Sequence, residues 1–390
     1  MDQSLVRLTN QEAIIDTLRK KGPTSRTDLA KELDISNPSI SKNINSLMKK
    51  GMVCEGEPVA TEIGRKPVML TFNPDCLSVA AVDFSGTEIR LCISNLVGRE
   101  LKGKIIKGSE DFQPEDIQRT VNELEALATG VKLSALCVSV PGHFNPSTGA
   151  VLYANRFKNC AEINLKELFE KSFKSLPLLI HNDVKLAVSG EQEFGHTNNT
   201  QNLMYVNVGV GIGAGLLLDG KLYEGRNGYA GEIGQMVSGF SSNEEGQTFE
   251  QLASTSALIK RVQAAYNAQE GDADEITLKQ IALAAQNGNE ICLREISSSA
   301  KLLGRMLYNI NSTLDLDMII IGGGAKELGE IYLSELKQII GSAPKTGNIA
   351  VRYSTVPNNE LMGAISVASR IALQKAIELT EKEWLKWLNT

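Results

Sequence analysis

The feature that most constrains the fold is a set of glycine-rich turns, each placed directly after a short apolar run. They lie at residues 83–87 (DFSGT), 209–215 (GVGIGAG) and 322–324 (GGG). Backbone N–H groups in such turns can approach a phosphate or another ligand closely. The middle turn is followed by a strand-like run and not by a helix, which distinguishes it from a dinucleotide-binding fingerprint. One such turn alone is common where backbones pack tightly. Several in this order indicate an α/β fold with ligand sites at strand ends.

Apolar, partly β-branched runs continue along the chain from residue 78. They occupy residues 79–83, 90–94, 135–140, 178–180, 204–208, 213–218 and 318–321. Helical patterns at 114–128 and 184–194 lie between some of them. This order predicts parallel strands with a hairpin at the start of each half. Amphipathic patterns at 288–313 and 360–385 predict two long helices.

The length indicates more than one domain. A chain of 390 residues suits two or three domains, and 42% hydrophobic against 22% charged residues is enough to bury a core. The Asn73-Pro74-Asp75 sequence predicts a boundary after a first domain at 1–75. We expect two α/β lobes to follow, at 76–195 and 196–390, with the last helix packing back on the first lobe.

The first domain has the outline of a winged helix-turn-helix. Residues 9–12 (TNQE) form a capping-box pattern that predicts the start of a first helix, and Gly22 ends it. Ser25 is expected to open a second helix, and Asn37 to cap a third with Pro38 at its first position. Short strands are predicted at 52–54 and 68–72, so a hairpin follows the three helices.

The third helix carries the candidate DNA-reading face, because its polar residues lie away from Ile40, Ile44 and Leu47. A Lys can neutralise phosphate or bond guanine, an Asn can pair with an adenine edge, and a basic hairpin tip can enter a minor groove. The alternative is a small helical bundle whose polar face is only solvated. The candidate DNA contacts are Asn37, Ser39, Ser41, Lys42, Asn45, Arg65 and Lys66.

The charge distribution permits a nucleic-acid contact without demanding it. Residues 1–72 carry 11 Lys and Arg against 9 Asp and Glu, a net charge of +2 within a chain total of −6. The six cysteines are far apart and form no CxxC pair, which favours reduced thiols. No apolar run is long enough to cross a bilayer and no signal core opens the chain, so we expect a cytoplasmic protein without a membrane partner.

Polar residues at strand ends are candidate ligands for a small molecule. Asn182 and Asp183 follow a predicted strand, where open α/β sheets place ligand groups. Asp183 could accept bonds from sugar hydroxyls or act as a general base, or it could merely cap the helix that starts at Val184. Asn155, which follows the turn at 141–143, and Glu232, within residues 231–235 (GEIGQ), are further candidates.

Taken together, these motifs resemble the ROK family of repressors and sugar kinases. The matching segments are DFSGT (83–87), VPG (140–142), AN (154–155), HND (181–183), GVGIGAG (209–215), GYAGEIGQ (228–235), FEQLAS (249–254) and IIIGGG (319–324), with TSRTDLAKEL (24–33) and GRKP (64–67) resembling the repressor branch. The resemblance implies a two-lobed, actin-like ATPase fold, built like a sugar kinase, with a sugar in the cleft. It implies sugar-contacting roles for Asn155, Asn182, Asp183, Glu232 and Glu250, with Asp183 at the position of the kinase base.

Several positions depart from the kinase pattern. Gln235 stands where family kinases usually have His, and we include it among the sugar contacts. Ser241, Asn243 and Thr248 occupy positions of zinc-binding cysteines, so the sequence predicts no structural zinc. Ser85 and Val210 replace a Gly and a Thr of the phosphate turns, which weakens an ATP site. We therefore expect no catalytic residue and no cofactor.

These departures favour a sensor over an enzyme. The expected protein is a repressor of carbohydrate genes, a dimer or a dimer of dimers, bound to an inverted-repeat operator and released by a sugar or sugar phosphate. An active ATP-dependent sugar kinase carrying a DNA-binding arm is the alternative. A third possibility is an activator or a constitutive DNA-binding scaffold.

Overall fold

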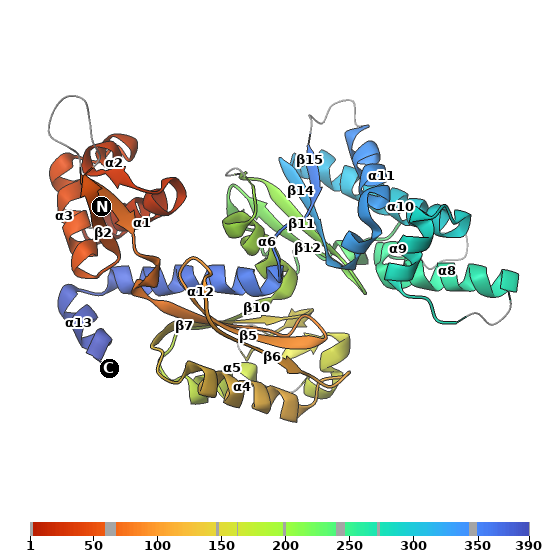
Figure 1. The fold of residues 1–390 in the computed structure, drawn as a ribbon, viewed down its shortest axis with the longest axis horizontal. Coiled ribbons are helices and arrows are strands. Elements are labelled where there is room, and N and C mark those ends of the chain that lie inside the picture. The colour runs from red at the N-terminus through yellow and green to blue at the C-terminus, as the bar shows by residue number, and fades with distance from the viewer. Residues whose placement is uncertain are drawn as a thin grey trace.

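The computed structural model describes residues 3–58, 68–145, 148–161, 163–197, 200–238, 246–270, 274–342 and 349–389. Its described strands form a three-stranded sheet, two five-stranded sheets and a two-stranded ribbon. Figure 1 shows the N-terminal helices at one end, one large sheet beside them, and the second large sheet further away, with helices beyond it at the far end. The helix α12 (Asn359–Glu378) runs from the N-terminal helices toward the space between the large sheets.

The N-terminal domain is a winged helix-turn-helix, as predicted. Its elements are α1 (Gln3–Lys21), β1 (Thr24–Ser25), α2 (Arg26–Glu32), α3 (Asn37–Lys49), β2 (Val53–Pro58) and β3 (Val68–Phe72). The sheet has the order β1-β3-β2, so the short strand β1 joins the predicted hairpin. Ile14, Leu29, Ile40 and Ile44 are fully buried between the helices and the sheet.

Two details of these helices were predicted wrongly. The capping box at 9–12 does not start α1, because the helix already begins at Gln3 and the Thr9 hydroxyl donates within it to Leu5 O at 3.1 Å. Packing of the apolar face in the folded domain stabilises a longer helix than the local capping signal indicates. Ser36, and not Asn37, is the N-cap of α3, while Ser25 caps α2 as expected.

The first large sheet has the order β10-β7-β4-β5-β6. Its strands are β4 (Ser78–Asp83), β5 (Glu88–Asn95), β6 (Glu100–Lys107), β7 (Leu133–Val140) and β10 (Leu178–Asn182). β4, β7 and β10 are parallel, and β5 and β6 are antiparallel neighbours. α4 (Pro114–Ala128) and α5 (Leu165–Ser172) cover one face, over a core that includes edge-to-face contacts of Phe84, Phe112 and Phe157.

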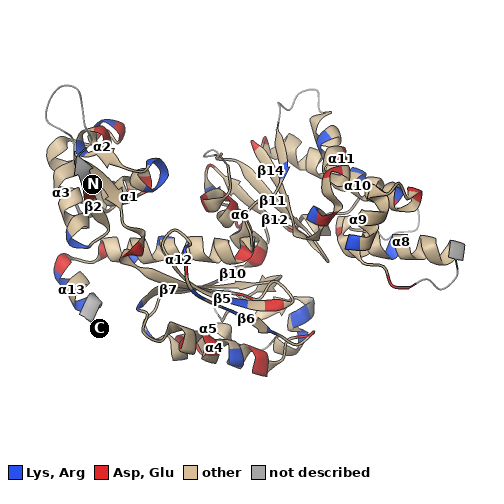
Figure 2. Ribbon diagram, viewed as in Figure 1, with Lys and Arg blue, Asp and Glu red and all other residues tan. Residues whose placement is uncertain are grey.

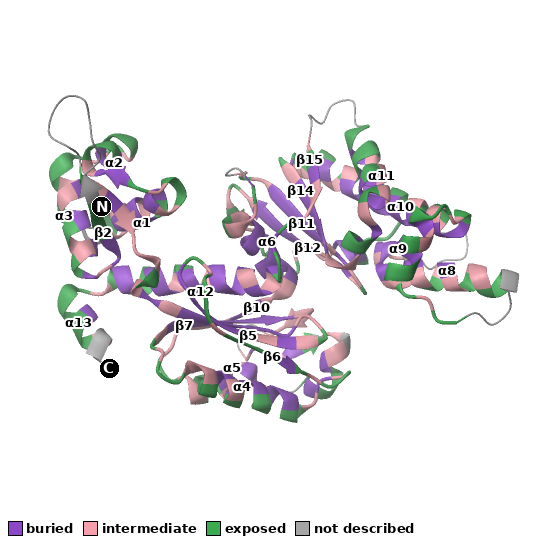
Figure 3. Cartoon of the chain, in the orientation of Figure 1, coloured by how far each residue is buried: buried purple, intermediate pink, exposed green. Residues whose placement is uncertain are grey.

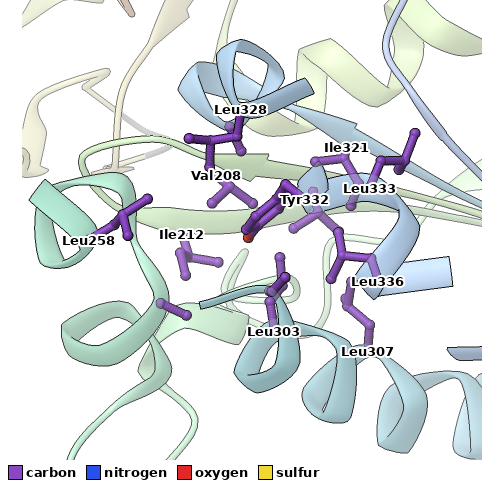
Figure 4. Packing of buried hydrophobic residues seen from close by; sticks show 14 of the residues in the cluster. Val208, Ile212, Leu258, Leu303, Leu307, Ile321, Leu328, Tyr332, Leu333 and Leu336 are labelled. Carbon is purple, nitrogen blue, oxygen red and sulfur yellow. The ribbon is translucent and has the colours of Figure 1, made fainter. Parts of the chain in front are cut away.

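The second large sheet has the order β13-β12-β11-β14-β15. Its strands are β11 (Leu203–Val208), β12 (Ile212–Leu218), β13 (Lys221–Leu222), β14 (Met318–Gly322) and β15 (Ala350–Tyr353). One face packs on α7 (Phe249–Ala253), α8 (Thr255–Glu270), α9 (Leu278–Gln286), α10 (Glu290–Leu314) and α11 (Gly329–Gly341). In that core Tyr332 is enclosed by Val208, Ile212 and Leu303 (Figure 4).

Two helices lie between the large sheets and exchange partners. α6 (Asp183–Phe194) follows β10 of the first sheet in sequence but packs on β11 and β12 of the second. α12 follows the second sheet but packs on β4 and β7 of the first. The two helices also pack on each other, and α12 is buried along most of its length (Figure 3).

The remaining elements are short. They are β8 (His143–Phe144), β9 (Val151–Tyr153), α13 (Glu381–Asn389), and the 3-10 helices η1 (Pro74–Cys76), η2 (Asn155–Cys160), η3 (Ile233–Gln235) and η4 (Gly323–Leu328). The pattern at 360–385 thus forms two helices, because α12 ends at Glu378 and α13 begins at Glu381. A winged helix-turn-helix joined to a two-lobed, actin-like fold confirms the predicted fold class. Within the part of the chain that the structure describes, no helix is long and apolar enough to span a bilayer.

Candidate functional site

The exposed face of α3 carries the candidate DNA contacts that the structure describes. Asn37, Lys42 and Asn45 are exposed and Ser39 and Ser41 are half-buried, while Ile40, Ile44 and Leu47 point into the core. Small hydroxyls beside a Lys and an Asn suit close approach to a base edge. Charges of both signs are spread over this domain (Figure 2). The face is therefore polar and not uniformly basic.

The structure adds Arg26 to this face. Its guanidinium donates to Asn45 Oδ1 at 3.2 Å and pairs with Glu55 Oε1 at 3.0 Å, so it joins α2, α3 and β2. Its side chain is 30% exposed. The sequence analysis missed Arg26 because it lies on another helix, and no local pattern connects it with Asn45. Arg65 and Lys66, the predicted contacts of the wing, lie outside the described residues.

At the second candidate site, the carboxyl ends of the parallel strands meet along one sheet edge. Asp83 is opposite Ser139, and Asn182 is opposite Val140. Asn182 is the N-cap of α6: its Oδ1 accepts from Lys185 N at 3.0 Å. Its Nδ2 donates to Gly142 O at 2.9 Å and to Asp183 Oδ1 at 3.0 Å. The alternative in which Asp183 caps this helix is therefore wrong, since Asp183 is its first helical residue.

Asp183 lies among other acidic groups. Its Oδ1 accepts from Val184 N at 2.8 Å. Burial, and then the nearby charge of Glu360 at the start of α12, raise the pKa of Asp183 well above its usual value. Burial and the charge of Asp83 raise the pKa of Glu360 to about 7. A carboxyl group with such a raised pKa can donate a hydrogen bond to a ligand oxygen as well as accept one.

A cavity of about 440 Å³ lies beside these strand ends, between the two lobes. The first lobe contributes His143, His181 and Lys185, and the second contributes Glu224, Tyr229 and Glu232. Its volume is in the range of small-molecule sites.

Contacts across this cavity join the lobes. His181 Nε2 lies 3.0 Å from Glu224 Oε1, and His143 Nε2 lies 3.5 Å from Glu232 Oε2. The buried Lys185 ammonium donates to Gly228 O, and burial lowers its pKa. The bond from His181 lowers the pKa of Glu224. Polar groups from both lobes thus converge on one volume, which is what a ligand that draws two lobes together requires.

The structure brings some of the predicted sugar contacts together and separates others. Asn182 and Glu232 line the cavity. Gln235 is exposed at the end of η3, and Glu250 Oε2 instead accepts from Ile212 N at 2.9 Å, beside the glycine-rich turn. Asn155 begins η2, but its side chain lies outside what the structure describes.

The cavity also contains His143, His181, Lys185, Glu224 and Tyr229, which the sequence analysis did not select. The position of His181 next to Asn182 and Asp183 was a usable signal. The other residues become neighbours only when the lobes pack together.

The glycine-rich turns of the second lobe meet at one sheet edge, since Asn207 lies opposite both Gly213 and Gly322. Gly323 has φ +71°, and a Cβ there would lie 2.5 Å from Asn207 Oδ1. Only glycine fits this conformation and approach without strain. Val210, in the turn after β11, exposes 74% of its surface. The turns therefore have close backbone geometry, and Val210 presents an exposed apolar side chain in one of them.

Thr248 starts a helix, as its own hydroxyl accepts from Gln251 N at 3.3 Å in a capping box of α7. The neighbouring Ser241 and Asn243 lie outside the described residues. The expectation of no structural zinc thus stays a prediction.

Comparisons with known proteins agree with this architecture. A family model described as ROK family matches residues 79–371, and one described as winged helix-turn-helix DNA-binding matches residues 7–53. The chain is 28% identical over 358 residues to a protein named xylose repressor from Caldicellulosiruptor bescii, covering 87% of this chain and 89% of that protein. It is 23% identical over 390 residues to the DNA-binding transcriptional dual regulator NagC of Escherichia coli, covering 95% and 94%.

Solved structures share the fold. A ROK family transcriptional regulator, described as a homologue of the E. coli MLC protein, matches with a TM-score of 0.81 at 22% identity, covering 99% of this chain and 100% of that chain. A ROK family glucokinase from Streptomyces griseus matches with a TM-score of 0.63 at 24% identity, covering 75% and 99%.

Fold and site together define a class of protein in which a winged helix-turn-helix precedes a two-lobed domain built like a sugar kinase. Within that class the chain belongs to the ROK family.

Proposed function

We propose that this protein is a cytoplasmic DNA-binding repressor of carbohydrate genes that a sugar or sugar derivative releases from its operator. The observation that carries the proposal is the pairing of an exposed polar α3 face with a polar cavity between two lobes, in one chain. The names of the relatives, xylose repressor and NagC among them, support the same function.

We assign the proposed roles to three units, residues 1–75, 76–195 and 196–390. The first reads DNA with Asn37, Ser39, Ser41, Lys42 and Asn45, and with Arg65 and Lys66 on the wing. The two lobes bind the effector with Asn155, Asp183 and Glu232. Asn182 orients Asp183, while Gln235 and Glu250 approach the sugar when the lobes close. The working form is a dimer or a dimer of dimers on an inverted repeat.

A ligand can release the repressor only if it binds the DNA-incompetent arrangement more tightly than the competent one. To move nearly all of the protein from the DNA-competent to the DNA-incompetent arrangement, the ligand needs a difference in affinity of about 5 kcal/mol between them. Hydrogen bonds from both lobes to one sugar are a suitable source, because they form together only in one arrangement of the lobes.

The test uses an operator selected from random DNA by the full-length protein. Its release is titrated with D-xylose, D-glucose, N-acetyl-D-glucosamine and the 6-phosphates of the last two. We expect one of them to weaken operator binding at least ~5-fold, the lower end of ordinary allosteric coupling. If none of these sugars changes operator binding, the result would favour a constitutive DNA-binding scaffold. If a sugar strengthens operator binding, the result would favour an activator.

The alternative function, a sugar kinase, is favoured by Asp183, which directly follows Asn182, the residue that ends β10 and lines the cavity. We infer that turnover is negligible, because Ser85 and the exposed Val210 replace residues of the phosphate turns. ATP turnover with Mg²⁺ and the same sugars measures this. A rate of about 1 per second or faster, ordinary for an enzyme, would establish the kinase.

A further inference from the structure

The helices α6 and α12 each extend from the acidic groups between the lobes to the winged helix-turn-helix. α6 begins with Asp183, and α12 carries Glu360 in its first turn, and these two carboxyl groups interact electrostatically. With 20 residues, α12 spans about 30 Å at 1.5 Å per residue. Its other end lies against the N-terminal domain (Figure 1).

Lys50 joins the end of α12 to the DNA-reading helix. It is the C-cap residue of α3, and its side chain is turned away from solvent, since the residue exposes only 3% of its surface. Its ammonium donates to Ala376 O at 2.9 Å, Ile377 O at 3.0 Å and Leu379 O at 2.7 Å. The last carbonyls of a helix lack partners within it and carry the negative end of its dipole. A buried ammonium that satisfies three of them fixes α3 to α12.

A second contact joins the end of α6 to the same domain. Glu193, in the last turn of α6, pairs with Arg19 of α1, and their side chains are only 29% and 13% exposed. Two residues earlier, the fully buried Glu191 pairs with Arg352 of β15 at 3.1 Å and accepts from Asn359 Nδ2 at 3.1 Å. The same turn of α6 therefore holds the second lobe, α12 and α1.

The two helices pack too closely to move independently. A Cβ on Gly363 of α12 would lie 1.8 Å from Leu186 O of α6, and one on Gly190 of α6 would lie 2.7 Å from Asn359 O. Backbone contacts of this kind leave little room for sliding, because packed interiors do not deform continuously.

We propose that α6 and α12 act as one coupling unit that turns the winged helix-turn-helix when the lobes move, through Lys50 and the Arg19–Glu193 pair. This inference rests on the proposed function, since it specifies how an effector between the lobes reaches DNA. Lys50 and Glu193 are positioning residues: they touch neither the effector nor the operator. Each lobe movement that shifts the start of either helix must shift these contacts too.

The test measures three quantities for the full-length protein: the operator Kd, the sugar Kd and the factor by which the sugar weakens operator binding. The variants are Lys50→Met and Glu193→Gln, and the probe is the sugar of the panel above that releases the wild type, with D-xylose tried first. Lys21→Gln and Lys31→Met are matched controls, because both lysines are exposed in the same domain and Lys21 pairs with Glu32 within it.

We expect both variants to keep the operator Kd and the sugar Kd within about threefold of the wild type. The release factor should fall from the ordinary ~5–150-fold range toward 1, while the controls keep it. A variant that binds both ligands and is released as fully as the wild type would overturn the inference and leave the proposed function standing. If no sugar releases the wild type, the proposed function fails and the inference fails with it. If Lys50→Met loses its cooperative thermal transition, Glu193→Gln alone decides, because its pair is partly exposed.

Discussion

Asn182 and Asp183 are neighbours in sequence but have different tasks. The Asn182 side chain is used within the protein, as the cap of α6 and as a donor to Gly142 O. The Asp183 Oδ1 accepts a hydrogen bond from Val184 N. The carboxyl group interacts electrostatically with Asp83, Glu232 and Glu360. At the scale of single residues, a substitution at Asn182 should therefore change the stability of the fold, while a substitution at Asp183 should change the response to the effector.

For Asp183→Ala we expect unchanged operator binding and loss of sugar release. Each hydrogen bond between the ligand and a neutral carboxyl contributes about 0.5–1.5 kcal/mol, so the loss of two of them should raise the half-effect concentration at least about fivefold. Asn182→Ala should instead lose about 1 kcal/mol of stability, the usual cost of removing an N-cap. Titrated operator release and thermal unfolding of both variants measure these effects. An unchanged half-effect concentration in Asp183→Ala would end its assignment to the effector site.

Glu360 should make stability depend on pH. Its pKa is about 7 in the folded protein, and its ordinary value is 4.5, so the folded state binds more protons between these values. This contribution to stability is complete below pH 4.5 and is lost as pH rises through 7. Glu360→Gln removes the loss, so it should raise the melting temperature more at pH 8 than at pH 5. Thermal unfolding of wild type and variant measures the difference, with the exposed Glu327→Gln as a control. Asp83 and Asp183, which face Glu360, also have raised pKa values and will broaden the transition.

At the scale of elements, α3 combines a buried apolar stripe with an exposed polar face. Ser36 is its N-cap, and Pro38 lies in its first turn. Lys50 is its C-cap and donates a hydrogen bond to Ala376 O of α12. Such a helix can present side chains to a groove of DNA while its buried face and its contact with α12 fix its position.

Lys42 is an exposed cation of this face, and Lys42→Ala should weaken operator binding. If Lys42 contacts phosphate, the slope of log K against log salt should become shallower by about 0.9. If it bonds guanine, specificity should relax at one base pair, with a loss of about 1–3 kcal/mol. Binding measured at several salt concentrations on the selected operator distinguishes these cases. Lys31→Ala, an exposed lysine of α2, is the matched control. Equal effects at Lys31 and Lys42 would place the contact surface elsewhere.

At the scale of the whole molecule, the two lobes are joined by helices that each cover the sheet of the other lobe. α6 packs on β11 and β12, and α12 packs on β4 and β7. The N-terminal domain lies against the end of α12 (Figures 1 and 3), and Arg19 of α1 pairs with Glu193 in the last turn of α6. These contacts are the route by which the proposed coupling unit would carry a change between the lobes to the winged helix-turn-helix.

We expect the assembled protein to protect an inverted repeat, with half-site centres about one helical turn of DNA apart or a multiple of it. A two-fold symmetric pair of winged helices requires this spacing. Footprinting on the selected operator and sedimentation of the free protein, with a chain mass of 42.3 kDa, test it. A single asymmetric footprint bound by one chain would contradict the dimer.

The sequence by itself determined the features that depend on neighbouring residues. The apolar runs gave most of the strands, the Ile40, Ile44 and Leu47 spacing gave the face of α3, and Ser25 marked the start of α2. Close backbone turns need glycine, so Gly323 was visible as a special position from its motif alone. These signals are local because caps, periodicity and φ values act within one or two helical turns.

Only the tertiary structure decided which distant residues meet. The helix α1 begins earlier than the local capping pattern predicts, because packing of its apolar face outweighs the cap. Glu250 accepts a hydrogen bond from a backbone amide beside the glycine-rich turn and does not line the cavity. Lys50 meets residue 376, and Arg19 meets Glu193, across separations of 326 and 174 residues. No pattern of period 2 or 3.6 specifies such pairs. They arise because each helix between the lobes must bury its apolar surface on a sheet that is formed by another part of the chain.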